Sequence, residues 1–408
     1  MLVEAFGWYQ RLESKKRYKW FTWVRLMSIS HAWRSAILSF PALWSVVYLS
    51  SKVSPETIRM LLQRSGGHSL DVIVPPEFFG TAPKFYRYSH ALDVSAHMSR
   101  IRKLLFHRNH GRNDVKHIVR IFSKPAPSLT HLEFVASQLQ EESLSFPSLF
   151  GLEFPKLRVL KVEGVDGWPE IVGANLTRIT FNNFLLPRVL KRCIPYSPNL
   201  QVLRTQGVWG VDELDPIARQ RITLPPGIHL VVQDSGVCSR VIALFALPHD
   251  GCLKVRHSTY STPDKPLLPY ILPTDISHLH NLRTLTRLHT KVHICVGTAL
   301  ELKGFRSDQL AFEVNVKYPW ESRTMVQRGH SSVMWVLGNL HRPVLREVEE
   351  LRIEGFVEPL EPQGTEFLTF LKGMPALKRL ITTDGNEETL RSALDCLGCR
   401  AVVVRVKL

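Results

Sequence analysis

A short leucine phrase recurs along most of the chain and constrains its fold more than any other feature. It consists of a small or polar residue, Leu, two polar residues, Leu, one further residue and an apolar residue. The steps between central apolar residues are 28, 19 and 24 from Leu132 to Leu203, and 29 from Leu351 to Leu380. The copies are SLTHLEF at 128–134, KLRVLKV at 156–162, NLTRITF at 175–181, NLQVLRT at 199–205, NLRTLTR at 281–287, VEELRIE at 348–354 and ALKRLIT at 376–382, with IRKLLFH at 101–107 as a weaker copy.

This phrase indicates a repeat array. One L-x-x-L carries no information in a leucine-rich chain, but seven copies have a pitch similar to that of leucine-rich repeats. In such an array alternate leucines face inward, and stacked neighbours complete a core that one repeat cannot form. We therefore predict an α/β fold in which residues 46–408 form a curved leucine-rich-repeat-like solenoid with a mostly parallel sheet. The residues expected to be buried are Leu132, Leu157, Leu160, Leu203, Leu351 and Leu380.

Residues 206–278 break the pitch of the repeats. They contain LPPGIHLVV and STPDKPLLPYILPTD, in which prolines interrupt any regular pattern. We interpret this stretch as an insertion or as degenerate repeats.

The N-terminal part has a different pattern. Apolar residues at helical spacing predict one helix over 20–39, which Pro41 ends. Residues 44–49 and 70–74 are rich in β-branched residues and predict two strands. Between them, Ser54 is a candidate N-cap, Pro55 fits the first helical position and Gly66 or Gly67 fits the C-terminal cap. The sequence therefore predicts a βαβ unit after a helical segment at 1–45.

Positive charge is concentrated in two stretches. The chain has 52 Lys+Arg and 36 Asp+Glu, a formal charge of +16, and residues 1–34 and 84–124 carry net charges of +5 and +8. A clustered basic surface attracts phosphates or acidic proteins, or is simply a solvated face. We do not expect nucleic-acid binding, because no nucleic-acid-binding signature accompanies the charge. The basic patch consists of Arg100, Arg102, Lys103, Arg108, Arg112, Lys116, Arg120 and Lys124.

The sequence shows no arrangement typical of catalysis. It contains no G-x-x-x-x-G-K-[ST], H-E-x-x-H or G-x-S-x-G motif. Cys396 and Cys399 form a C-x-x-C without a second pair, which favours a structural role over zinc or redox chemistry. The His107-x-x-His110 pair has no supporting ligands nearby, so we expect no metal site. Because the motifs typical of catalysis are missing as well, we expect no enzyme activity and no cofactor.

The cysteines and the apolar segments indicate where in the cell the protein is located. Six cysteines, mostly far apart, indicate reduced thiols, and Cys238 and Cys252 are expected to be small buried residues. The first 22 residues lack the apolar core of a signal peptide, and the uncharged run at 35–51 is too short to span a bilayer. We therefore expect a soluble, cytoplasmic or nuclear protein without membrane contact.

A resemblance emerges from residues 20–75. Ile29-Ser30-His31-Ala32-Trp33-Arg34 followed by Pro41-Ala42-Leu43-Trp44 resembles the second half of an F-box, in which Val-Cys-x-x-Trp-Arg precedes Pro-x-Leu-Trp. The segment SPETIRMLLQRSGGHSLDVIV is similar to the stretch that follows the F-box in fungal F-box proteins with irregular leucine-rich repeats. Residues 1–22 do not carry the family's Leu-Pro-x-Glu and first helix, so the resemblance is to an F-box lacking its first half.

The resemblance implies a non-catalytic substrate-recognition adaptor of a cullin-type (SCF) ubiquitin ligase. The repeat array would hold an unknown protein substrate. The alternative is a repeat scaffold outside the ubiquitin system that contacts acidic partners or nucleic acid through its basic patch. The residues that the resemblance implies at the interface with the Skp-type adaptor are Ile29, Ser30, Trp33, Ile37, Leu43 and Trp44.

The residues themselves leave a second interpretation of these tryptophans open. Trp20, Trp23, Trp33 and Trp44 are large enough to form the core of a small helical module. If they pack internally, they are buried without a partner, and if they form an interface, Trp33 is partly exposed in the isolated chain.

Overall fold

The chain is organised in two compact units. One comprises Met1–Lys161 and Gly167–Gly173, and the other comprises Val162–Asp166 and Ala174–Leu408. The computed structural model describes residues 22–49, 53–75, 84–106, 121–122, 124–135, 155–163, 175–182, 190, 193–207, 221–233, 238–258, 272–273, 275–293, 299–317, 342–354, 365–382, 387–398 and 400–406.

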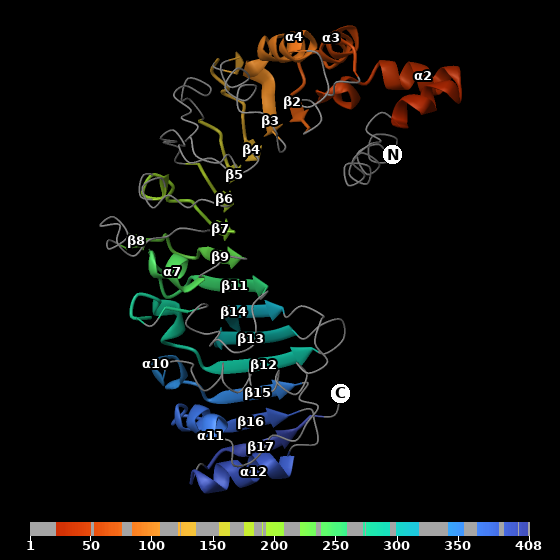
Figure 1. The fold of residues 1–408 in the computed structure, drawn as a ribbon. Coiled ribbons are helices and arrows are strands. Elements are labelled where there is room, and N and C mark those ends of the chain that lie inside the picture. The colour runs from red at the N-terminus through yellow and green to blue at the C-terminus, as the bar shows by residue number, and fades with distance from the viewer. Residues whose placement is uncertain are drawn as a thin grey trace. The chain divides into compact units, whose positions relative to one another are not determined.

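The first unit begins with helices and continues as a parallel sheet (Figure 1). Strands β1, β2, β3 and β4 pair in this order, and every pair is parallel. Strand β5 follows β4 in the sheet, and the boundary between the two units falls within it. The described elements of the first unit are η1 (Thr22–Ser28), α2 (His31–Leu38), η2 (Pro41–Trp44), β1 (Val46–Tyr48), α3 (Pro55–Arg64), β2 (Leu70–Val74), α4 (Lys84–Ser95), η4 (Met98–Arg100), β3 (Ile101–Phe106), β4 (His131–Val135) and β5 (Val159–Glu163).

The βαβ unit predicted from the sequence is present. Strands β1 and β2 pair in parallel on either side of α3 in the chain. The Ser54 hydroxyl accepts a hydrogen bond from the Thr57 amide, which caps the N-terminus of α3. Gly66 adopts a φ of 51° just beyond the C-terminal cap, where a side chain would be strained.

The single helix predicted over 20–39 is wrong, because two short helices occupy this segment. Ser30 has an extended backbone (φ −158°, ψ 164°), and its hydroxyl accepts a hydrogen bond from the Trp33 amide at 3.2 Å. A residue that caps a helix in this way cannot lie in the middle of one. Apolar spacing alone does not detect the break, because it continues across the cap.

The second unit contains most of the strands. Its main sheet has the order β6-β7-β9-β11-β14-β13-β12-β15-β16-β17, and β8 and β10 form a separate parallel pair. Its described elements are β6 (Arg178–Asn182), β7 (Val202–Gln206), β8 (Ile222–Thr223), β9 (His229–Gln233), α7 (Cys238–Ala243), β10 (Phe245–Ala246), β11 (Cys252–Ser258), η6 (His280–Leu282), β12 (Arg287–His293), β13 (Ala299–Arg306), β14 (Gln309–Lys317), α10 (Arg342–Leu345), β15 (Glu350–Glu354), α11 (Thr365–Lys372), β16 (Arg379–Thr382), α12 (Glu387–Cys396) and β17 (Val402–Arg405).

The main irregularity of this sheet lies at the hairpin β13–β14. Strand β13 is antiparallel to both β12 and β14, whereas β14 is parallel to β11 and β12 is parallel to β15. The hairpin is therefore inserted between strands that would otherwise be neighbours in a parallel array. The stretch 206–278, by contrast, contributes β9 and β11, which continue the parallel order from β7.

Strand register shows which residues occupy equivalent positions. Leu203 pairs with Leu230, which pairs with Leu253. Leu288, Leu351 and Leu380 form a similar series on β12, β15 and β16. The leucines expected to be buried, which are Leu132, Leu157, Leu160, Leu203, Leu351 and Leu380, are all at most 1% exposed. This confirms the inward face of the phrase and the α/β class with a mostly parallel sheet.

Register also corrects three copies of the phrase. Leu351 pairs with Leu380, the fifth residue of its copy, so the copy on β15 is EVEELRI at 347–353 rather than 348–354. Because Leu288 is the residue that pairs with Leu351, the copy on β12 is TLTRLHT at 284–290 rather than 281–287. Leu104 pairs with Leu132, so the weak copy on β3 is RIRKLLF at 100–106 rather than 101–107. The errors on β12 and β3 arise where extra leucines satisfy the pattern in more than one register.

Candidate protein-interaction site

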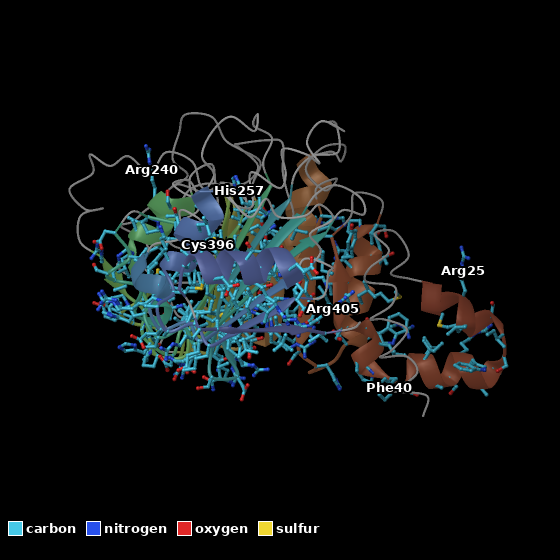
Figure 2. All side chains as sticks on the ribbon, turned by 90° about the horizontal axis from the view of Figure 1, so that it is seen from below. Arg25, Phe40, Arg240, His257, Cys396 and Arg405 are labelled. Carbon is cyan, nitrogen blue, oxygen red and sulfur yellow. The ribbon has the colours of Figure 1, made fainter. Side chains whose placement is uncertain are left out.

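Helix α2 makes few contacts with the rest of the first unit. Six of its eight residues are exposed, and only Ile37 is buried. The helix is held by the preceding η1, because Arg34 Nε donates a hydrogen bond to the Met27 carbonyl at 3.2 Å. Figure 2 shows Arg25 extending from η1 toward solvent. A short helix with this exposure gains little stability from burial, and its free faces are open to a partner.

The end of this segment is anchored by a buried tryptophan. Trp44 is 2% exposed, and its indole Nε1 donates a hydrogen bond to the Ile37 carbonyl at 3.0 Å. The Arg64 guanidinium at the end of α3 lies 4.9 Å from the centre of the Trp44 ring, within cation–π range. Leu43 is also buried, at 6% exposure. These side chains attach the helical segment to α3.

The six residues assigned to the adaptor interface by resemblance therefore fall into two groups. Ile37, Leu43 and Trp44 are core residues of the first unit. Ile29 is 62% exposed, Ser30 is exposed and Trp33 is half-buried. Ile29, Trp33 and Ile37 do not lie on one continuous helix, because Ile29 precedes the N-cap of α2. The side chains of Trp20 and Trp23 lie outside the described residues.

The segment also has other apolar residues that are exposed or half-buried. Leu38 at the end of α2 is 37% exposed, and Leu26 and Met27 on η1 are half-buried. Sequence reasoning did not select Leu38, because it follows the buried Ile37 directly and no pattern distinguishes the two. The partly exposed apolar surface of the described segment, which we call the N-terminal apolar surface, consists of Leu26, Met27, Ile29, Trp33 and Leu38.

Arg100 of the predicted basic patch has a structural role. Its guanidinium donates hydrogen bonds to the Leu62 carbonyl at 2.8 Å, to Ser65 Oγ at 2.9 Å and to the Gly66 carbonyl. A fourth contact reaches the His68 carbonyl at 3.3 Å. The side chain thus satisfies backbone acceptors at the C-terminal end of α3, where a cation also interacts favourably with the helix dipole.

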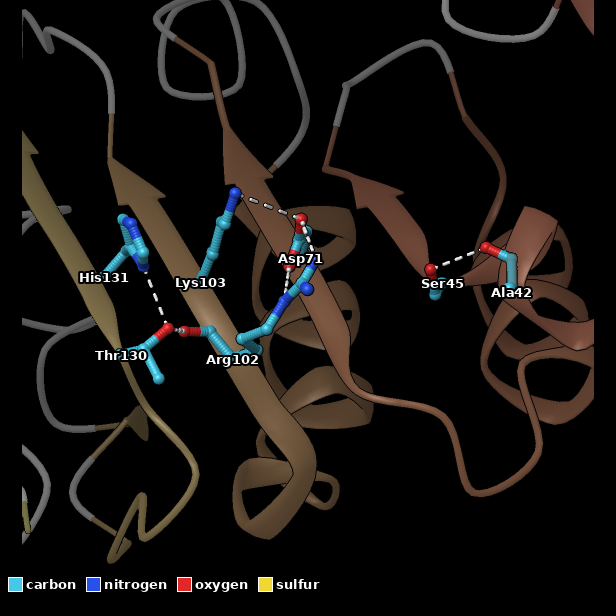
Figure 3. Close-up of polar contacts among 7 residues, drawn as sticks. All are labelled: Ala42, Ser45, Asp71, Arg102, Lys103, Thr130 and His131. Atoms are coloured by element: carbon cyan, nitrogen blue, oxygen red, sulfur yellow. Dashed lines mark hydrogen bonds and ion pairs between the residues drawn. The ribbon is translucent and has the colours of Figure 1, made fainter. Parts of the chain in front are cut away.

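Two more residues of the patch share one carboxylate (Figure 3). Arg102 on β3 donates two hydrogen bonds to Asp71 on β2, at 3.0 and 2.9 Å, and Lys103 Nζ lies 3.9 Å from the same group. The hydrogen bonds with Asp71 raise the pKa of Arg102. Lys124 is exposed, whereas Arg108, Arg112, Lys116 and Arg120 lie outside the described residues. Among the described residues of the patch, Arg102 and Lys103 therefore share Asp71, whereas Arg100 contacts the C-terminal end of α3, so all three interact within the protein.

Few groups suited to chemistry converge within the described part of the chain. No set of three His, Cys, Asp or Glu residues among the described ones could hold a metal ion. Cys238 and Cys252 are buried, as predicted, and burial raises the pKa of the Cys252 thiol to about 11. Cys396 is exposed, and Cys399, His107 and His110 lie outside the described residues. None of the described helices has the length and apolar character needed to cross a bilayer.

Comparison with known proteins adds no assignment to this site. No protein-family model matches the sequence, and a search of curated proteins finds no significant match.

Proposed function

We propose that this chain is a non-catalytic, F-box-like substrate-recognition adaptor of a cullin-type ubiquitin ligase. In this proposal the N-terminal apolar surface contacts a Skp-type adaptor protein, and the parallel strands with their connections bind a protein substrate. The observation that supports the proposal most is that α2 has six exposed residues of eight while the adjoining Trp44 is fully packed. A helix attached at one end and exposed elsewhere is suited to binding a partner in a groove.

The division between core and exposed residues makes the proposal more specific. Ile37, Leu43 and Trp44 fix the position of the segment, whereas Ile29, Trp33 and Leu38 are accessible for contact. Exposed apolar residues that lie close together are a feature of protein interfaces, and tryptophan contributes strongly to binding energy there. We assign direct adaptor contact to the second group only.

The test is binding of the full chain to a purified Skp-type adaptor, measured by isothermal titration calorimetry. Ile29→Asp places a charge in the proposed interface and should weaken binding by at least tenfold. Leu92→Asp is the matched control, because Leu92 on α4 is 57% exposed, close to the 62% of Ile29, but does not belong to the surface. Both variants should keep the thermal unfolding midpoint of the parent, since neither side chain is buried.

Three outcomes would contradict the proposal. The parent chain fails to bind the adaptor, the two variants weaken binding equally, or Ile29→Asp unfolds the chain. The last outcome would mean that Ile29 belongs to the core, where an unpaired charge costs several kcal/mol. A parent that does not bind the adaptor would favour the alternative of a repeat scaffold outside the ubiquitin system.

A further inference from the structure

Four neighbouring strands of the second unit contain no acidic residue. Strands β6, β7, β9 and β11 have the sequences RITFN, VLRTQ, HLVVQ and CLKVRHS. They are consecutive in the sheet, and each adjacent pair is parallel. The same strands carry four cationic side chains, which are Arg178, Arg204, Lys254 and Arg256.

The cations share the face of the sheet that is opposite the core. Successive side chains of a strand point to opposite faces. On β7 the core-facing Leu203 and Thr205 are buried, and Arg204 between them is partly exposed. On β11 the buried Leu253 and Val255 alternate with Lys254 and Arg256. Arg178 likewise precedes the buried Ile179 and is exposed.

Strand register places these cations close together. Arg178 pairs with Val202, two residues before Arg204, and Val231 of β9 pairs with both Arg204 and Lys254. From the strand spacing and the rise per residue, the α-carbons of Arg178 and Arg204 lie about 8 Å apart, and those of Arg204 and Arg256 about 12 Å apart. Extended polypeptide rises about 3.3 Å per residue, so these separations correspond to two to four residues of a bound segment.

Three of the four cations make no ion pair or hydrogen bond to a described residue. They are Arg178, Arg204 and Arg256, whereas Lys254 is 3.0 Å from Glu313 on β14. We call these three arginines the arginine triad. Cations close together on strands that contain no acidic residue repel one another, so binding of an anionic group there relieves the repulsion.

In the other half of the same sheet, by contrast, the cationic side chains form ion pairs. Glu354 on β15 is nearly buried, and Lys291, Arg352 and His289 surround it at 3.2 Å, 2.5 Å and 3.4 Å. Arg379 likewise pairs with Glu350 at 3.1 Å. On those strands positive charge is matched within the sheet, which makes the unmatched charge of the arginine triad a local feature.

We propose that the arginine triad binds an acidic, extended segment of a partner protein across strands β6, β7, β9 and β11. The proposal deepens the proposed function, because it assigns acidic chemistry to the substrate held by the array. A protein segment is favoured over single-stranded nucleic acid because binding of the latter relies on aromatic stacking. The described outward positions Arg178, Thr180, Val202, Arg204, Gln206, His229, Val231, Gln233, Cys252, Lys254 and Arg256 include no Phe, Tyr or Trp.

The test measures fluorescence anisotropy of the full chain with a labelled peptide of alternating glutamate and serine. A peptide of alternating glutamine and serine is the uncharged control, and oligodeoxythymidine of the same length is the nucleic-acid probe. The triple variant Arg178→Gln, Arg204→Gln, Arg256→Gln should bind the acidic peptide at least about tenfold more weakly, since exposed charge pairs contribute a factor of about two to three each. Salt should weaken binding by the parent chain more than by the variant.

The matched control removes the same net charge elsewhere. Lys378→Gln, Arg379→Gln, Arg391→Gln replaces three cations that are ion-paired with Glu349, Glu350 and Glu387. This variant should bind the peptide within about twofold of the parent. Replacing the arginine triad by three lysines keeps the charge and should retain binding within about threefold, which separates loss of charge from loss of fold.

The proposal is overturned if both Gln variants lose the same affinity, if the parent binds the glutamine–serine peptide as tightly, or if oligodeoxythymidine binds more tightly than the peptide and depends on the same arginines. Adaptor titration with the Gln variant of the triad distinguishes this failure from failure of the proposed function. The arginine triad should not affect adaptor binding. A chain that binds the peptide through the triad but does not bind the adaptor would support this inference alone.

Discussion

Replacement of Arg100 tests whether this residue of the basic patch stabilises α3 or binds a ligand. Arg100→Met removes the donors to the Leu62 carbonyl and to Ser65 Oγ, which are 2.8 and 2.9 Å from the guanidinium. Hydrogen bonds from charged donors contribute about 1.5–3 kcal/mol each, and water can replace part of this at a partly exposed site. We therefore expect α3 to lose about 2 kcal/mol of local stability.

Hydrogen exchange at the amides of α3 provides the assay. A loss of about 2 kcal/mol corresponds to a roughly 30-fold faster exchange, because each 1.4 kcal/mol is a factor of ten. Amides of β15 and β16 in the second unit serve as the internal reference and should not change. Arg100→Lys should lose nearly as much protection as Arg100→Met, because a single ammonium cannot replace the planar guanidinium at several acceptors.

The lysine variant also gives the refuting result. If Arg100→Lys exchanges as slowly as the parent, charge alone suffices and the capping geometry is irrelevant. If Arg100→Met leaves exchange unchanged and weakens binding of a polyanion, Arg100 belongs to a ligand surface and the structural interpretation is wrong.

Two further predictions concern the second unit. Gly304→Ala should destabilise the chain by about 1–3 kcal/mol, because the new Cβ would lie 2.7 Å from Leu285 Cδ1; a urea midpoint equal to that of the parent would contradict this. Burial, followed by the charge of Arg221, lowers the pKa of His278 from 6.5 to about 4. Below pH 6.5 the unfolded chain therefore binds a proton that the folded chain does not, so stability should fall from pH 6.5 to 4. His278→Gln should lessen this dependence in urea titrations, and an unaltered pH profile would exclude the histidine as a contributor.

The inward face of the repeat phrase was predictable because each copy must place its leucines in the core. Leu132, Leu203 and Leu380 are buried as expected, since a period of two in a strand leaves one face for apolar residues. The N-cap at Ser54 was equally predictable, because a serine directly before proline at a helix start has a local cause. Features determined by short-range rules can be read from one sequence.

Features determined by pairing at a distance could not be predicted. The hairpin β13–β14 is inserted between β11 and β12, and nothing within 299–317 distinguishes insertion from addition at an edge. Strand β9 continues the parallel order, but its sequence does not match the leucine phrase. Ile228 and Leu230 are two residues apart, whereas the two leucines of the phrase are three residues apart. The position of these strands in the sheet follows from strand pairing and register, which composition does not show.

The charged residues show the same difference between features that depend on local sequence and features that depend on strand pairing. The sequence drew attention to 84–124, where lysine and arginine are dense along the chain, yet Arg100 and Arg102 are hydrogen-bonded within the protein. Arg178, Arg204 and Arg256 are scattered over nearly 80 residues and become neighbours only through strand pairing. Charge density along the chain therefore does not show which arginines are hydrogen-bonded within the protein and which make no such contact with a described residue.

Contact between the N-terminal apolar surface and a Skp-type adaptor can be measured by hydrogen exchange of the full chain with and without the purified adaptor. We predict that the adaptor slows exchange of amides in η1 and α2, with the largest effect between Ile29 and Leu38. Amides of β12, β15 and β16 should exchange at the same rate in both samples. Unchanged exchange across η1 and α2 at saturating adaptor, or protection confined to the second unit, would contradict the proposed contact.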